Sequence, residues 1–117
     1  MNENDRIRLQ HMYDAAYEAR SFAAGKTREA LDADRGLVLI LTQLIMIIGE
    51  AAARISEETR LAHPNVAWRA IVGMRNHLVH AYFDVDLDII WNTIANRIPE
   101  LLETLAAILE TPSKTDT

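Results

Sequence analysis

Hydrophobic residues recur at helical spacing along most of the chain, and polar breaks divide them into four segments. In the first segment the apolar positions follow alternating steps of three and four residues, with Asn4 as the expected N-cap and Gly25 as the expected stop. No segment shows the period of two that marks a half-buried strand. The pattern therefore predicts an all-α fold. The apolar positions of the first helix are Leu9, Met12, Ala16, Ala19 and Ala23.

The second segment is apolar almost throughout and predicts a central helix from Arg35 to about Ser56, preceded by a connector with some helical content. A break at His63-Pro64-Asn65 then separates it from a shorter third helix, which runs from about Val66 to His80. Because the second helix is apolar on nearly every side, we expect the other helices to pack against it.

The fourth segment has the clearest helical period, and either Asp84 or Asp86 can cap its first turn. Pro99 lies inside it and should kink the helix. Together the segments predict an up-and-down bundle of four main helices over residues 1–110, followed by a polar tail over 111–117. The stripe of the fourth helix consists of Leu87, Ile90, Ile94, Ile98, Leu101, Leu105 and Ile108.

The longest apolar stretch runs from Gly36 to Gly49, and its 14 residues fall short of the roughly 20 needed to span a bilayer. We therefore expect a buried core helix and no membrane partner. The chain has no cysteine, and its first residues are polar and acidic where a secretory signal would be basic and then apolar. Both features indicate a cytoplasmic protein.

The formal net charge of −5 argues against a general nucleic-acid binder, because phosphate contacts need a cationic surface. The charge is uneven, however. Between Thr59 and Phe83 there is no acidic residue, whereas Arg60, Arg69, Arg75 and three of the four histidines lie there. This local excess of positive charge favours a focused phosphate site.

Arg75 falls in the middle of the apolar arc of the third helix, where a guanidinium needs either an acid or an anionic ligand. Glu50 is the only acid between Gly36 and Ser56, so an Arg75–Glu50 pair in the core is one expectation. A phosphate site is the other. The two are compatible, because a carboxylate can orient a guanidinium without occupying all its donors.

His80 lies five residues after Arg75, roughly 7.5 Å along the helix axis and on a different face. Asn76 precedes His80 by four residues and shares its face. The two can hold one phosphate if Arg75 reaches along the groove, if the helix unwinds near Tyr82, or if a second subunit completes the site. Because residues on both sides of this helix need burial, we expect a homodimer, or a higher oligomer, built on the third and fourth helices near Arg75–Tyr82. His77 and His80 lack a third ligand nearby, so we expect no metal site and no cofactor.

The order Arg75-Asn76-His77-Leu78-Val79-His80-Ala81-Tyr82 has the form R-x4-H-x-Y, and it resembles the signature of HEPN-domain ribonucleases. Within that superfamily the chain is most similar to HepT-like toxins, which are paired with an MntA-type minimal nucleotidyltransferase antitoxin. The residues Ile48 to Ser56, the Pro64–Trp68 entry and the overall length contribute to the resemblance. It covers nearly the whole chain.

The resemblance implies a HEPN-like bundle that acts as an endoribonuclease toxin on RNA without a metal ion. His80 would move protons and Arg75 would hold the phosphate, with Asn76 and Glu50 in support. It also implies that the partner nucleotidyltransferase silences the toxin by adenylylating Tyr82. The alternative is a non-catalytic helical module that binds a nucleotidyltransferase, a nucleotide or both.

Overall fold

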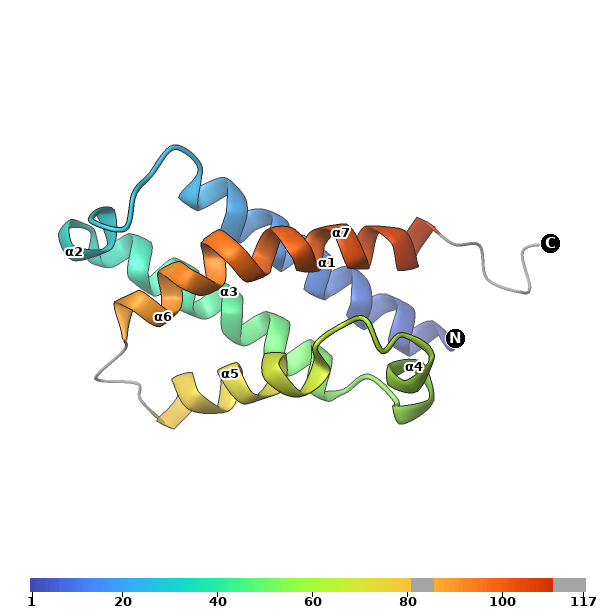
Figure 1. The fold of residues 1–117 in the computed structure, drawn as a ribbon. Coiled ribbons are helices and arrows are strands. Elements are labelled where there is room, and N and C mark those ends of the chain that lie inside the picture. Colours follow the sequence, from blue (N-terminus) through green and yellow to red (C-terminus); the bar gives the residue numbers. More distant parts are fainter. Residues whose placement is uncertain (81–85, 111–117) are drawn as a thin grey trace.

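The computed structural model describes the backbone of residues 1–80 and 86–110, and the side chains of these residues except 78–80. Every regular element in the described part of the chain is a helix, which confirms the predicted all-α class (Figure 1). The elements in chain order are α1 (Glu3–Ala23), α2 (Ala30–Ala33), α3 (Arg35–Ala53), α4 (Glu57–Ala62), α5 (Trp68–His80), α6 (Leu87–Asn92), the π-helical turn η1 (Thr93–Arg97) and α7 (Ile98–Glu110).

The long helix α3 is the hub of the bundle, as its apolar sequence predicts. It packs against α1 on one side and against α5 on the other, while α7 packs along α1 (Figure 1). The interior is filled by aliphatic side chains from α1, α3 and α7, with Trp68 at the start of α5. The fully buried residues with the largest side chains are Leu9, Met12, Leu41, Ile90, Leu105 and Asp5.

Capping side chains fix where the helices begin, and one of them differs from the prediction. The N-cap of α1 is Asn2, whose Oδ1 accepts a hydrogen bond from the backbone N–H of Asp5 at 2.7 Å. Asn4 lies inside the first turn, so its predicted capping role is wrong. Gly25 follows the end of α1 with a φ of 75°, the left-handed conformation in which glycine commonly ends a helix. Asp86 caps α6, which is one of the two predicted possibilities.

The helix predicted to continue to Ser56 ends at Ala53, and Ser56 instead caps a separate short helix, α4. Two interactions stabilise this break. The Ser56 hydroxyl accepts a hydrogen bond from the backbone N–H of Thr59, and the Arg60 guanidinium donates to the backbone carbonyls of Ala52, Ala53 and Ile55. The carbonyls at the end of α3 are therefore satisfied by an arginine from the next helix.

The irregularity expected at Pro99 takes the form of a π-helical turn just before it, at Thr93–Arg97. Proline has no N–H to donate to the carbonyl of Ala95, and its ring would clash with that carbonyl in a regular α-helix. Within the wide turn the N–H of Ile98 bonds to the carbonyl of Thr93, five residues earlier. Of the predicted stripe, Leu101 is only partly buried, and Leu102 lies in the core instead.

By length and composition alone, α3 could also cross a membrane, with a mean hydropathy of 2.0 over 18 residues. The core helix of a water-soluble protein passes the same test. Here α3 is covered by α1 and α5 on two sides, although Leu39, Ile40 and Ile47 on its remaining side are exposed.

Candidate functional site

The site region begins at Gly49, where α3 and α5 are in close contact. A Cβ atom at this position would collide with the Cβ of Arg75, and it would also lie 3.0 Å from the Arg75 Cγ and 3.2 Å from the Ile71 carbonyl oxygen. Only a residue without a side chain lets the two helices meet at this distance. Gly49 therefore places the start of the Arg75 side chain directly on α3.

The Arg75 guanidinium is held by two neighbours. Its Nη2 donates to Glu50 Oε1 at 2.9 Å, and its Nη1 donates to Asn76 Oδ1 at 2.8 Å. The ion pair between Arg75 and Glu50 predicted from the sequence is thus confirmed. A guanidinium has five N–H donors, so these two bonds leave three of them. Nε is buried and has no hydrogen-bond partner among the described residues.

The environment of this pair differs from the prediction, which placed it in the core. The Arg75 side chain keeps 33% of its surface exposed and the Glu50 side chain keeps 51%. The reason is the position of Glu50, which follows Gly49 on α3 and lines an open cleft between α3 and α1. The pair is therefore partly exposed to solvent and is not sealed in the core.

The structure brings together three of the five residues predicted for the site: Glu50, Arg75 and Asn76. The amide oxygen of Asn76 binds Arg75, so in this state Asn76 helps to fix the guanidinium. His80 is the last residue of α5, which confirms that one continuous helix carries both Arg75 and His80. The His80 side chain and the whole of Tyr82 lie outside the described part of the structure.

A cleft of about 400 Å³ opens on the same side of α3, between that helix and α1. Glu50 lies on its edge, so the cleft adjoins the Arg75 pair. Arg8, His11 and Arg54 bring positive or ionisable groups to it, and these residues could not be grouped from the sequence because they lie far apart along the chain. The cleft is lined by Asn4, Ile7, Arg8, His11, Ile47, Glu50, Ala51 and Arg54.

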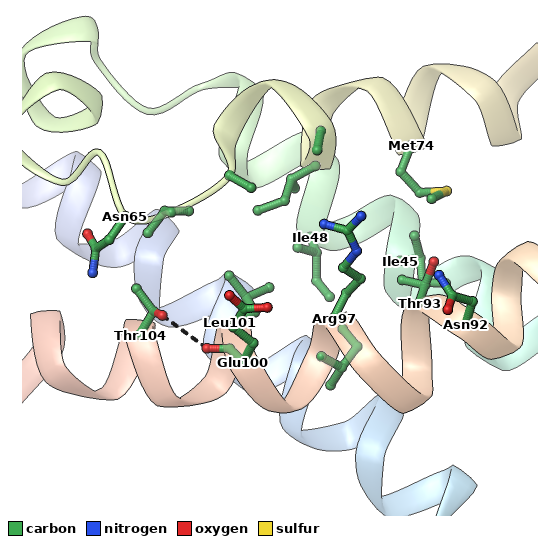
Figure 2. A pocket seen from close by; sticks show the side chains of 15 residues that line it. Ile45, Ile48, Asn65, Met74, Asn92, Thr93, Arg97, Glu100, Leu101 and Thr104 are labelled. Carbon is green, nitrogen blue, oxygen red and sulfur yellow. Dashed lines mark hydrogen bonds between the residues drawn. The ribbon is translucent and has the colours of Figure 1, made fainter.

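A second cavity, of about 180 Å³, lies between α5 and the η1–α7 segment (Figure 2). Its walls are mostly aliphatic, and Ile45 and Ile48 of α3 contribute to them. Arg97 extends from the π-helical turn into this space, and Asn92, Glu100 and Thr104 lie along the same edge. This cavity is on the flank of α5 that faces η1 and α7.

Asp5 is a buried acid that the sequence analysis missed. Its side chain is 1% exposed, and its carboxylate accepts hydrogen bonds from the Ser56 hydroxyl at 2.5 Å, the Ser56 N–H at 3.1 Å and the Thr59 hydroxyl at 2.6 Å. Burial alone would raise the pKa of Asp5, but these hydrogen bonds and the charge of Arg8 outweigh it and lower the pKa. The carboxylate ties the start of α1 to the start of α4, so its role is structural.

Among the residues that the structure describes, no group of three or more histidine and acidic side chains is placed to hold a metal ion.

Comparison with known proteins identifies the family. The model for "Ribonuclease HepT-like" proteins matches residues 12–108. The protein named "Putative RNase TTE0752" of Caldanaerobacter subterraneus subsp. tengcongensis is 42% identical over 77 residues, which cover 66% of this chain and 69% of the relative. The "Probable ribonuclease HepT" of Thermococcus cleftensis is 37% identical over 68 residues, which cover 58% of this chain and 62% of that protein.

A longer match is to "Gamma-glutamylcyclotransferase and putative RNase MJ0434" of Methanocaldococcus jannaschii, which is 28% identical over 110 residues, or 94% of this chain and 50% of the relative. The matched regions thus span between half and about two thirds of these relatives. No solved structure matches the chain. Because the family model covers most of the chain, including α3, α5 and the Glu50–Arg75 pair between them, the protein belongs to the ribonuclease HepT-like family.

Proposed function

We propose that this protein is an endoribonuclease that cleaves RNA by internal attack of the ribose 2′-hydroxyl. The single observation that carries the proposal is the state of Arg75. Its guanidinium is held in place by Glu50 and Asn76 and retains donors that neither neighbour uses, and one third of the Arg75 side chain is exposed. A fixed cation with free N–H groups is suited to grip a phosphate and to stabilise the charge that grows on its oxygens.

In the proposed reaction the 2′-oxygen forms a bond to the adjacent phosphorus, and the bond from phosphorus to the 5′-oxygen of the next nucleotide breaks. The products are a 2′,3′-cyclic phosphate and a free 5′-hydroxyl. One proton leaves the 2′-hydroxyl and one proton reaches the departing 5′-oxygen. His80 accepts the proton from the 2′-hydroxyl and donates one to the departing 5′-oxygen, because imidazole both accepts and donates protons near neutral pH. DNA is spared because it has no 2′-hydroxyl.

We further propose that the enzyme is the toxin of a two-protein system and that a minimal nucleotidyltransferase silences it by adenylylating Tyr82. The support is family membership together with the place of Tyr82, two residues beyond His80 at the end of α5. An adenylyl group brings a phosphodiester with a negative charge. That charge would compete with the RNA phosphate for Arg75.

A homodimer is the assembly that we propose. Its interface includes α5 from Arg75 onward together with the fourth helical segment, as the sequence analysis predicts, and it extends onto α3 at Leu39 and Ile40, which are 52% and 39% exposed. Adjacent exposed apolar side chains favour burial against a second surface. Two-fold packing would bring two copies of the α5 site to one cleft.

The test is the His80→Ala variant, assayed on total RNA and on a defined oligoribonucleotide. We expect cleavage to be lost while the helical circular dichroism and the melting temperature stay close to those of the wild type. The products of the wild type should carry cyclic phosphate ends. A variant that cleaves RNA normally would show that His80 is not the proton carrier. A wild-type protein that binds its nucleotidyltransferase partner but leaves RNA intact would favour a non-catalytic module.

A further inference from the structure

The cleft between α1 and α3 is lined by basic side chains that have no part in the Arg75 site. It is lined by Arg8 and His11 on successive turns of α1 and by Arg54 at the end of α3. Glu50 is the one acid that lines it, and that carboxylate is engaged by Arg75. The described lining of the cleft thus carries two arginines and a histidine against one paired acid.

The two arginines are placed in different ways. The Nη1 of Arg8 donates to the backbone carbonyl of Arg54 at 3.0 Å, which fixes the Arg8 guanidinium at the carboxyl end of α3. The Arg54 side chain makes no hydrogen bond or ion pair with any described residue. The nearby acid Asp5 is buried and satisfied by Ser56 and Thr59, so it offers no free carboxylate to Arg54.

The cleft and the Arg75 pair are adjacent parts of one surface. Glu50 belongs to both, and Arg54 follows it by four residues, which corresponds to about 6 Å along a helix. Ile7 and Ile47 add apolar surface beside the arginines, on which a ribose or a base can pack.

From this arrangement we propose that the α1–α3 cleft is a second phosphate subsite, in which Arg8 and Arg54 hold the RNA phosphate next to the one that is cleaved. The inference rests on the proposed ribonuclease function and gives it a substrate class. The substrate is an extended single strand with a phosphate flanking the cleavage point, and a dinucleotide with one phosphate is a poor substitute. Arg8 and Arg54 are positioning residues, because they bind substrate away from the reacting atoms.

The experiment uses the full chain and a 2′-O-methyl oligoribonucleotide, which binds but has no free 2′-hydroxyl to react. Affinity is measured by fluorescence anisotropy across a range of salt concentrations, for the wild type and for Arg8→Gln, Arg54→Gln and the double variant. Each lost phosphate contact should reduce the slope of log affinity against log salt by about 0.7 for a single strand. The control is Arg20→Gln. Arg20 is an exposed arginine on α1, the helix that carries Arg8, and its guanidinium lies over the Tyr17 ring.

A second measurement places the contact along the strand. Cleavable oligonucleotides carry a neutral methylphosphonate at the first position on either side of the scissile phosphate. We expect one of these two replacements to raise KM about tenfold in the wild type and to have little further effect in Arg54→Gln, while kcat changes little in both. Arg54→Gln keeps the backbone carbonyl that Arg8 binds, so its fold should be retained, and thermal unfolding checks this.

The outcomes are distinct. If the wild type cleaves RNA but both variants match Arg20→Gln in salt slope and in response to methylphosphonate, the subsite is refuted and the proposed function stands. Equal weakening by every methylphosphonate position would also refute it, because diffuse attraction has no preferred phosphate. If the wild type does not cleave RNA at all, the proposed function itself fails.

Discussion

The contact between Gly49 and Arg75 makes a specific prediction about a single methyl group. In Gly49→Ala the added Cβ would overlap the Arg75 Cβ and lie 3.0 Å from its Cγ. Ordinary carbon–carbon contacts are about 3.5–4.0 Å, so α5 has to move away from α3 by roughly 1 Å. The colliding atoms belong to the root of the Arg75 side chain and to the α5 backbone, so a change of rotamer cannot relieve the overlap.

The effect on stability should be small and the effect on activity large. Overpacking a helix contact costs about 1–3 kcal/mol, and replacing glycine by alanine inside a helix returns about 1 kcal/mol. The net loss in the free energy of unfolding is therefore about 0–2 kcal/mol. The shift moves the Arg75 guanidinium relative to Glu50 and to the reacting phosphate, and a displacement of about 1 Å at a catalytic group lowers the rate on the order of 100-fold.

Gly73 supplies the matched control. It lies on α5, two residues before Arg75, and a Cβ added there meets no atom within 4 Å. Gly73→Ala should therefore stabilise the protein by about 0.5–1 kcal/mol and leave cleavage unchanged. Urea unfolding gives the stabilities and a fluorogenic oligoribonucleotide gives kcat and KM. If Gly49→Ala is as stable and as active as Gly73→Ala, the close approach of α3 and α5 does not position the site.

Three further predictions concern single side chains. Arg75→Ala should abolish cleavage yet lower the free energy of unfolding by only about 0–1 kcal/mol, because its pair with Glu50 is partly exposed; a largely unfolded variant in circular dichroism would contradict this. Asp5→Asn should cost about 1–3 kcal/mol at pH 7. Because the pKa of Asp5 is lowered in the folded protein, the stability that its carboxylate adds is complete above the unfolded pKa of 3.8. That stability is lost as the pH falls through the lower folded pKa. Urea unfolding of Asp5→Asn at several pH values should not show this loss at acid pH. Tyr82→Phe should retain ribonuclease activity but escape silencing by a co-expressed nucleotidyltransferase, and mass spectrometry of the co-expressed wild type should find the adenylyl mass on the Tyr82 peptide.

The helices themselves were predictable from the sequence, because each carries its own periodic apolar stripe and its own stop. Gly25 and Asp86 mark their boundaries in the expected way. The break after Ala53 was not predicted, since no glycine or proline interrupts residues 50–56. The break is stabilised by Ser56, which caps the start of α4, and by Arg60, which binds the carbonyls at the end of α3. Helix propensities do not reveal that a serine will cap a new helix and not continue the preceding one.

The site was predictable in part for a similar reason. The Arg75–Glu50 pair could be inferred because each residue is a charge in an otherwise apolar helix. Its exposure could not be inferred, because that depends on which side of α3 remains uncovered by α1 and α5. Arg8 and Arg54 are 46 residues apart, and an arginine on a solvent-exposed turn carries no signal of a partner elsewhere in the chain. Such a cluster becomes visible only once the helices are packed.

The way α5 is attached has a consequence for local stability. One flank of α5 rests on α3, and another lines the cavity beside α7. Among the described side chains of α5, those of residues 68–77, only Trp68 is buried. Segments with few buried contacts open at a lower free energy than the rest of a domain. The element that carries Arg75 and His80 is thus a unit that can loosen while the core of α1, α3 and α7 stays folded. A partner that favours the loosened or the docked state of this one helix could switch the proposed enzyme without unfolding it.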